Sequence, residues 1–386
     1  MATDTLSAIM PDIYAALDVV SREATAMIGS VTIDANASRA ALNQPVKVTI
    51  EGAIVGVDIV PAMIVPEPAA QTPTPATITI TKSRAFPFQI TGDNQRVYNA
   101  GGGWISARAG RIAQALRVAV NEVEADLTAL HITMSRAYGL ASAVPFASTL
   151  ADSAQLLKML TDNGAPRSDL KMVLGTTAAA NVRTLGQLTK ANEAGTTNTL
   201  RFGALLNIHG FEFGETGQLK TSVAGTAASA TVNNAGYAVG ATTLTLSAAG
   251  TGTVLAGDVL TFAGDTNQYV ITTGDTDVSN GGTIVLAEPG LRVAMSAATK
   301  AITVIAATQR NMAFSKSAII LAARAVATPD EGDMAEDRQM ITDPISGLPF
   351  EIAFYKGFKM NRYEINLAWG VKNIKPAHTM LLLGSV

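Results

Sequence analysis

The residue types that carry most protein chemistry are sparse in this chain and lie far apart. The three histidines, His131, His209 and His378, share no HExxH or other paired spacing, and the chain has no cysteine. A metal site needs several ligands that converge, so this spacing argues against a bound metal, and the absence of cysteine excludes disulfides and thiolate chemistry. No Gly-x-Ser-x-Gly segment supports a hydrolase-type serine nucleophile.

One dense group of carboxylates occurs, formed by Asp330, Glu331, Asp333, Glu336 and Asp337. Oxygen-rich loops of this kind can bind calcium, but the spacing does not match an EF-hand. Because exposed runs of charge are common, the pattern favours a solvated loop. The three glycines at 101–103 lack the phosphate-binding GxGxxG and GxxxxGK[ST] patterns and are more simply a flexible lead-in to a helix. We therefore expect no catalytic residue, cofactor or metal, and a protein that is not an enzyme.

The elements that position these residues are organised around residues 103–138. This segment has no proline, and its apolar residues, from Ile105 to Met134, recur mostly at steps of three and four. The spacing predicts a long amphipathic α-helix, on the order of 50 Å at about 1.5 Å per residue. Gly139 lies where a C-terminal helix cap is expected.

The polar face of this predicted helix is divided by the sign of its charges. Its first half carries Arg108, Arg111 and Arg117, and its second half carries Glu122, Glu124 and Asp126. This order opposes the helix dipole, which favours acidic residues near the N-terminus. The charges alone favour a solvated face with intrahelical pairs, but the arginines could instead meet carboxylates of an adjacent subunit. The candidate carboxylates are Glu51, Asp58 and Glu67.

The segments before this helix change in pattern. Residues 6–28 show a helical spacing that ends at Gly29, whereas residues 46–90 alternate apolar and polar side chains, as strands do. Five prolines at 61–75 hold the chain extended in between. A long two-stranded ribbon is marginal alone in water, so we interpret this excursion as an arm that reaches towards a partner.

The segments after the helix form a mixed region and then an all-β region. Residues 149–163 and 176–186 are predicted helices, and Leu170 to Leu174 and Phe211 to Phe213 are predicted strands. Residues 221–291 have no lysine or arginine and carry short apolar runs between Gly-rich turns. This shift in composition predicts a separate small β-sandwich or barrel. Alternating strands return at 350–354 and 363–369.

The overall composition points to burial against other subunits. Charged residues make up 15% of the 386 residues and hydrophobic residues 48%, with a mean hydropathy of +0.25. Such a surface is poorly charged for a free monomer. There is no apolar run of membrane-spanning length and no secretory signal. The net charge of -3 gives no general attraction to nucleic acid.

In their order, these parts resemble a tailed-phage major capsid protein, and most closely the podovirus coat-protein branch that carries a β-barrel insertion. Three stretches carry the resemblance at the level of sequence. GTGTVLAGDVLTFAG with the following QYVIT is similar to the insertion, and QRNMAFSKSAIILAARA to the return into the central domain. GLPFEIAFYKGFKMNRYEINLAWGVKNIKPAHTMLLLG is similar to the C-terminal strands.

The resemblance implies an α+β capsid fold with an all-β insertion domain. Its regions would be an N-terminal arm (1–44), an extended β-loop (45–100), the spine helix with the first part of the peripheral and central domains (101–220), the insertion (221–306) and the return strands (307–386). The chain would form hexamers and pentamers of an icosahedral virion shell, assembled in the host cytoplasm. No Lys and Asn pair for an interchain crosslink is evident.

The resemblance also implies partners. These would be scaffolding and portal proteins, with a decoration protein as an optional addition, and packaged DNA enclosed without sequence-specific binding and without a membrane. Two other functions stay open. An encapsulin-like nanocompartment subunit would share the fold without packaging DNA, and a β-rich surface adhesin is disfavoured by the long internal helix.

Overall fold

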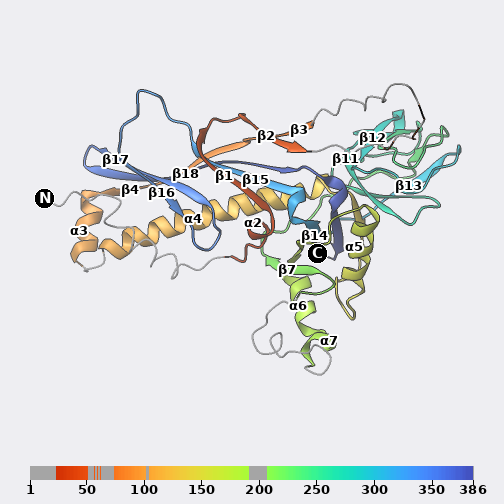
Figure 1. Cartoon of the computed structure of the whole chain (residues 1–386), viewed down its shortest axis with the longest axis horizontal. Coiled ribbons are helices and arrows are strands. Elements are labelled where there is room, and N and C mark those ends of the chain that lie inside the picture. The colour runs from red at the N-terminus through yellow and green to blue at the C-terminus, as the bar shows by residue number, and fades with distance from the viewer. Residues whose placement is uncertain are drawn as a thin grey trace.

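The structure, a computed structural model, describes residues 23–50, 74–100, 104–190 and 207–385, together with Gly56, Ile59 and Pro61. The fold is α+β, as expected, and the molecule is elongated (Figure 1). A sheet backed by one long helix lies at one end, a small barrel at the other, and a helix-flanked sheet projects between them. Within the described ranges, no helix is both long and apolar enough to cross a lipid bilayer.

The long helix α4 (Trp104–Thr128) runs along the molecule and supplies one side of the largest hydrophobic core. Ile112, Leu116 and Val123 are fully buried at the predicted helical spacing. The helix is shorter than predicted, because the chain continues after Thr128 as the 3-10 helix η1 (Ala129–Thr133) and the strand β5 (Arg136–Tyr138).

Tertiary hydrogen bonds explain this early end. The Thr128 hydroxyl donates to the Gln218 carbonyl at 2.9 Å, and β5 pairs in parallel with β19 (Thr379–Gly384). Bonds to another strand therefore replace those that a longer helix would make. Gly139 is not a helix cap but a point of close approach: its φ is +113°, and a Cβ there would lie 2.8 Å from the Leu383 carbonyl oxygen.

The sheet that packs on α4 has the strand order β1–β15–β18–β17–β16, and β4 pairs with the free side of β18. The strands are β1 (Thr32–Ala40), β4 (Lys82–Thr91), β15 (Ile319–Val326), β16 (Ala335–Thr342), β17 (Pro349–Gly357) and β18 (Met360–Asn373). The predicted alternation holds, since Phe350, Ile365 and Trp369 are fully buried in the core that α4 covers. Helix α3 (Gly92–Ala100) follows β4 at the distal end of this sheet.

The predicted ribbon is present at its base. Strands β2 (Pro45–Ile50) and β3 (Thr74–Thr79) pair antiparallel, with Val46 opposite Ile78. They rest on the first sheet, where Ile78 and Ile80 share a small core with Ile320. The proline-rich excursion between them and most of the predicted helix at 6–28 lie outside the described residues.

The sheet of the body runs β5–β19–β14–β6–β7. Its remaining strands are β6 (Leu170–Gly175), β7 (Phe211–Thr216) and β14 (Gln309–Ser315), and its helices are α5 (Ala151–Asp162), α6 (Thr176–Thr184) and α7 (Gly186–Thr189). Leu156, Leu174 and Val182 pack together in its core. The predicted helices and strands of this region are confirmed.

The strands between residues 231 and 304 close on themselves. They are β8 (Thr231–Val232), β9 (Thr243–Leu246), β10 (Val259–Phe262), β11 (Gln268–Thr273), β12 (Gly282–Leu286) and β13 (Lys300–Val304). Pairing runs β10–β13–β8–β9–β12–β11 and returns to β10, which is the connectivity of a barrel. All buried residues of the hydrophobic cluster inside the barrel lie between Ala230 and Ile302. Strand β11 also pairs with β5, which joins the barrel to the body.

Candidate assembly surface

The structure places the predicted contact arginines of α4 against groups of the same chain. Arg108 is buried, with 3% of its surface exposed, and donates to the Tyr363 hydroxyl at 3.5 Å. Arg111 donates to the Gln89 carbonyl at 3.2 Å and to the Tyr98 hydroxyl at 2.9 Å. Its guanidinium also lies 5.5 Å from the centre of the Tyr98 ring, so Arg111 ties α3 to α4.

The third arginine holds the start of the described chain. Arg117 donates to the Glu23 carboxylate, with Nε 2.8 Å from Oε2, and the Asn121 amide donates to the same carboxylate at 2.7 Å. These hydrogen bonds, that of Arg117 first, lower the pKa of Glu23 from its ordinary 4.5 to about 2. The carboxylate therefore stays ionised over a wide range of pH.

The acidic half of α4 is also paired with other elements of the chain. Lys82 of β4 lies 3.0 Å from Glu122 and 2.9 Å from Asp126, and Arg84 lies 3.1 Å from Glu122. The indole N–H of Trp369 donates to Asp126 at 2.9 Å. The interpretation of a solvated face with intrahelical pairs is therefore wrong for these residues, because the helix is packed against β4 and β18 along this face.

The central carboxylate of this half, Glu124, is fully buried. It accepts the backbone N–H groups of Met27 at 2.8 Å and Ile28 at 3.0 Å, which open helix α2 (Met27–Ser30). These hydrogen bonds give partners both to the buried carboxylate and to the N–H groups at the start of the helix. Burial nevertheless raises the pKa of Glu124. Residues 23–30 are thus held on α4 at both ends.

The candidate carboxylates Glu51, Asp58 and Glu67 lie outside the described residues. Their contact with the arginines of another subunit remains a prediction. Arg111 and Arg117 are half-buried, so part of each stays accessible to a neighbour.

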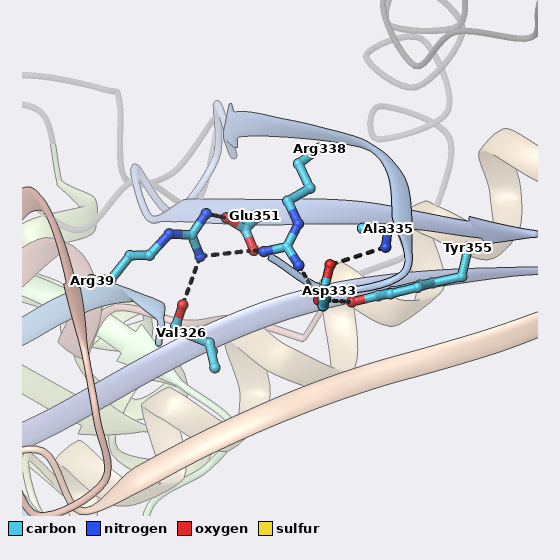
Figure 2. Close-up of polar contacts among 7 residues, drawn as sticks. All are labelled: Arg39, Val326, Asp333, Ala335, Arg338, Glu351 and Tyr355. Atoms are coloured by element: carbon cyan, nitrogen blue, oxygen red, sulfur yellow. Dashed lines mark hydrogen bonds and ion pairs between the residues drawn. The ribbon is translucent and has the colours of Figure 1, made fainter. Parts of the chain in front are cut away.

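A second network, missed in the sequence, joins three strands of the first sheet (Figure 2). Glu351 of β17, whose side chain is 3% exposed, lies between Arg39 of β1 and Arg338 of β16. Arg39 forms an ion pair with it and also donates to the Val326 carbonyl, and Arg338 lies 3.5 Å from its other oxygen. The signal was a single carboxylate inside the apolar strand sequence FEIAF.

The same network includes a residue of the acidic cluster at 330–337. Asp333 pairs with Arg338 and accepts the Ala335 N–H at 2.9 Å and the Tyr355 hydroxyl at 3.1 Å (Figure 2). Residues 330–334 form an exposed loop as expected, whereas Glu336 and Asp337 belong to β16, which begins at Ala335, so the expectation of a loop is wrong for these two residues. Cross-strand pairing to β17 supplies the hydrogen bonds that the composition could not predict.

The histidines stay apart in the fold. His131 contacts the Thr128 carbonyl at 3.1 Å, and burial lowers its pKa, as it does that of His378. His209 Nδ1 lies 2.9 Å from the Ser153 hydroxyl oxygen, which also lies 2.9 Å from the Leu150 carbonyl oxygen. Among the described residues, no group of three His, Asp or Glu side chains could hold a metal ion.

Apolar side chains are exposed at the distal end of the first sheet, which we call the tip: α3, the end of β4 and the turn between β17 and β18. Phe358 in that turn is 88% exposed and Val97 of α3 is 72% exposed. Helix α3 has no buried residue. A cavity of about 560 Å³ opens beside Phe358, between that turn and the β4–α3 junction. The turn sequence Gly-Phe-Lys gave no sign of this in advance.

No protein-family model and no curated protein matches the sequence. Solved structures similar to this chain include one from Mycobacterium phage Che8, with 14% identity and a TM-score of 0.48 over 94% of this chain and 92% of that chain. The capsid of cyanophage P-SCSP1u has 13% identity and a TM-score of 0.48 over 94% and 89%. The virus-like particle from Pyrococcus furiosus has 8% identity and a TM-score of 0.44 over 98% and 100%. At these identities and TM-scores the similarity concerns the fold alone and assigns no function to this chain.

Proposed function

We propose that this chain is a shell subunit, the major capsid protein of a tailed phage, which self-assembles around a genome and catalyses no reaction. The tip carries this proposal: α3 has no buried residue, and Phe358 beside it is 88% exposed at the end of an elongated molecule. Apolar surface of this kind, in a chain with only 15% charged residues, is typical of a protein that neighbouring copies complete.

The internal pairing of charges supports the same function. The charges of α4 and the Glu351 network hold the sheet, the helix and residues 23–30 together within one subunit. A subunit that is rigid by itself loses little conformational freedom when it joins a lattice. The order of ribbon, helix-backed sheet, body and barrel also agrees with the order of parts that the sequence resemblance implies.

The finer parts of the proposal concern partners and orientation. The shell would consist of hexamers and pentamers, built in the host cytoplasm with scaffolding and portal proteins and open to a decoration protein. The barrel, without a basic residue from 221 to 291, would face away from packaged DNA. The podovirus branch is proposed from the barrel insertion.

The contact between arginines of α4 and an adjacent excursion is part of the same proposal. Because Arg108 is buried, the proposed contact depends on Arg111 and Arg117. Reversal of Arg111 to Glu would place like charges at the contact with Glu51, Asp58 or Glu67 and prevent closure of shells. Normal shells from Arg111→Glu would remove this contact from the proposal.

Electron microscopy and analytical ultracentrifugation of the purified full chain test the function. We expect large closed or sheet-like assemblies. A stable monomer at high concentration, across salt conditions, would contradict a shell protein. Particles from the native source that contain a cargo enzyme in place of a genome would point to the encapsulin-like alternative.

A further inference from the structure

We propose that the chain modifies itself at Asn280, whose side-chain amide is lost by reaction with the backbone nitrogen of Gly281. The site lies in the loop between β11 and β12 of the barrel, where Asn280 is the last residue of the 3-10 helix η2 (Val278–Asn280). The co-reactant is water, and the products are ammonia and either aspartate or isoaspartate at position 280. The reaction takes place within one chain, so it goes beyond the proposed shell function and does not depend on it.

The reaction is a ring closure between neighbouring residues. The Gly281 nitrogen attacks the side-chain carbonyl carbon of Asn280 and loses its proton, and the side-chain nitrogen takes up a proton and leaves as ammonia. Glycine favours this step, because no Cβ crowds the attacking nitrogen. The product is a five-membered succinimide. Water then breaks one of its two ring C–N bonds, which leaves either a normal aspartate or an isoaspartate whose backbone passes through the side chain.

The chain contains a matched pair of sites for this chemistry. Its two Asn-Gly pairs are Asn163–Gly164 and Asn280–Gly281. Each lies where a helix ends, and the two glycines have nearly the same backbone conformation, with φ of +76° at Gly164 and +74° at Gly281. The residue pair and the glycine conformation therefore do not distinguish the sites. The fold distinguishes them by how it holds each side chain.

Asn163, at the end of α5, is held at both ends of its amide. Its Nδ2 donates to the Ala377 carbonyl at 2.8 Å, and its Oδ1 accepts from Arg136 at 3.1 Å. Arg136 is itself buried, with 3% of its surface exposed. The attacking nitrogen is occupied as well, because the Gly164 N–H donates to the Thr161 carbonyl at 2.9 Å. Ring closure at Asn163 would have to break these bonds.

Asn280 is exposed, and its side chain bonds within its own turn. Its amide nitrogen donates to the Asp277 carbonyl at 2.8 Å and to the Gly281 carbonyl at 2.7 Å. These bonds hold the side chain against the residue that supplies the nucleophile. The Gly281 N–H makes a long hydrogen bond, 3.4 Å to the Val278 carbonyl. Such bonds in a short 3-10 helix are weak, so little free energy is needed to release the attacking nitrogen.

The turn at Asn280 can open while the barrel stays folded. Val278 is fully buried and anchors η2, whereas Ser279 and Asn280 are exposed. Exposed turns open locally with a free energy far below that of global unfolding. Opening at Asn163 would instead disturb the end of α5 and Arg136, which also bonds the barrel residue Asn267. We therefore infer that the fold protects one Asn-Gly pair and leaves the other reactive.

The modification changes both the bonding and the charge of the turn. A carboxylate at position 280 cannot donate to the Asp277 and Gly281 carbonyls, and it adds a negative charge to a turn that already carries Asp275 and Asp277. Residues 221–291 contain no lysine or arginine to balance that charge. The aged barrel should therefore be more acidic than the newly made one.

The test is to age the purified full chain in buffer and to follow both Asn-Gly sites by peptide mapping with mass spectrometry, using an isoaspartyl methyltransferase to detect isoaspartate. We expect Asn280 to convert at least about tenfold faster than Asn163. In urea, where the fold no longer holds either side chain, the two sites should convert at similar rates. Asn280→Gln would have to close a larger ring, so its aged form should not show the acidic shift on ion exchange that the wild type shows.

Conversion at Asn280 that is no faster than at Asn163 in the folded chain would overturn the proposal. A difference of the same size in urea would also overturn it, because the local sequence and not the fold would then set the rates. Electron microscopy of the same samples scores assembly separately. Absence of shells would count against the proposed function and leave the Asn280 site standing.

Discussion

Glu351 and Glu124 are two buried carboxylates that join separate segments of the chain. Glu351 gathers Arg39 and Arg338 from two other strands, and Glu124 gathers the first amides of α2. Removal of one partner of a buried ionic group leaves the others uncompensated, which costs more than the pair contributes. Single substitutions should therefore have large electrostatic effects at these two sites.

Glu351→Gln should lower the free energy of unfolding by about 3–5 kcal/mol, because it leaves two arginines without their buried carboxylate. Urea unfolding monitored by circular dichroism measures this change. The matched control is Glu336→Gln on the neighbouring strand, whose exposed pair with Lys356 should contribute less than about 1 kcal/mol. Equal effects of the two variants would show that the Glu351 network adds no stability.

The hydrogen bond from Arg117 makes Glu23 a source of acid sensitivity. Its pKa is depressed from 4.5 to about 2, so its contribution to stability is complete above 4.5 and is lost as the pH falls towards 2. The pKa of Glu124 is raised, so its contribution to the free energy of unfolding changes with pH in the opposite direction. Comparison of wild type with Glu23→Gln in urea unfolding from pH 6 to pH 2 isolates Glu23. The variant should lose less stability than the wild type over that range, and parallel curves would refute the link.

At the scale of elements, α4 is stabilised by what it covers more than by its own sequence. Its acidic residues lie in the second half, against the helix dipole, yet they are bound by Lys82, Arg84 and Trp369 of the adjacent strands. Its apolar stripe packs on β4 and β18. A helix in this position depends on tertiary packing for its length and its end.

Leu116→Ala should therefore destabilise the subunit by about 2–5 kcal/mol, because it opens a cavity in the core beneath α4. Val118→Ala, two residues further along and 54% exposed, should change stability by less than about 0.5 kcal/mol. Thermal melting of both variants gives the comparison. A similar loss in both would mean that α4 is not held by its apolar stripe.

At the scale of the whole molecule, the barrel is a unit inserted between the body strands. Its core residues come from its own segment, whereas the other cores combine residues from distant parts of the chain. It joins the body through the β5–β11 pairing, through Arg136, which donates to the Asn267 side chain at 3.0 Å, and through Val259, Val270 and Ala287, which lie in the core beneath α4. A segment with its own closed core should keep its fold when isolated.

Residues 221–306, expressed alone, should therefore give dispersed amide signals by NMR. Residues 307–385 alone should not, because β14, β15 and β18 pair with strands from the first half of the chain. A random-coil spectrum from 221–306 would show that the β5 contact is needed for barrel closure.

The sequence by itself determined the elements whose signal is local. The apolar spacing of Ile112, Leu116 and Val123 predicted a helix, and the alternation in β17, β18 and the barrel predicted strands, because each pattern reports which side of an element is buried. The change of composition at 221 likewise marked the barrel segment, because composition is a property of the sequence.

Only the tertiary structure decided where α4 ends, that β16 lies within the acidic run, and which charges meet. These features depend on contacts between residues far apart in the chain: Thr128 bonds Gln218, and Arg39 meets Glu351, 312 residues away. The sequence did not predict the exposed tip for the same reason. Phe358 lies in the turn between β17 and β18, and the fold alone decides whether other elements cover that turn.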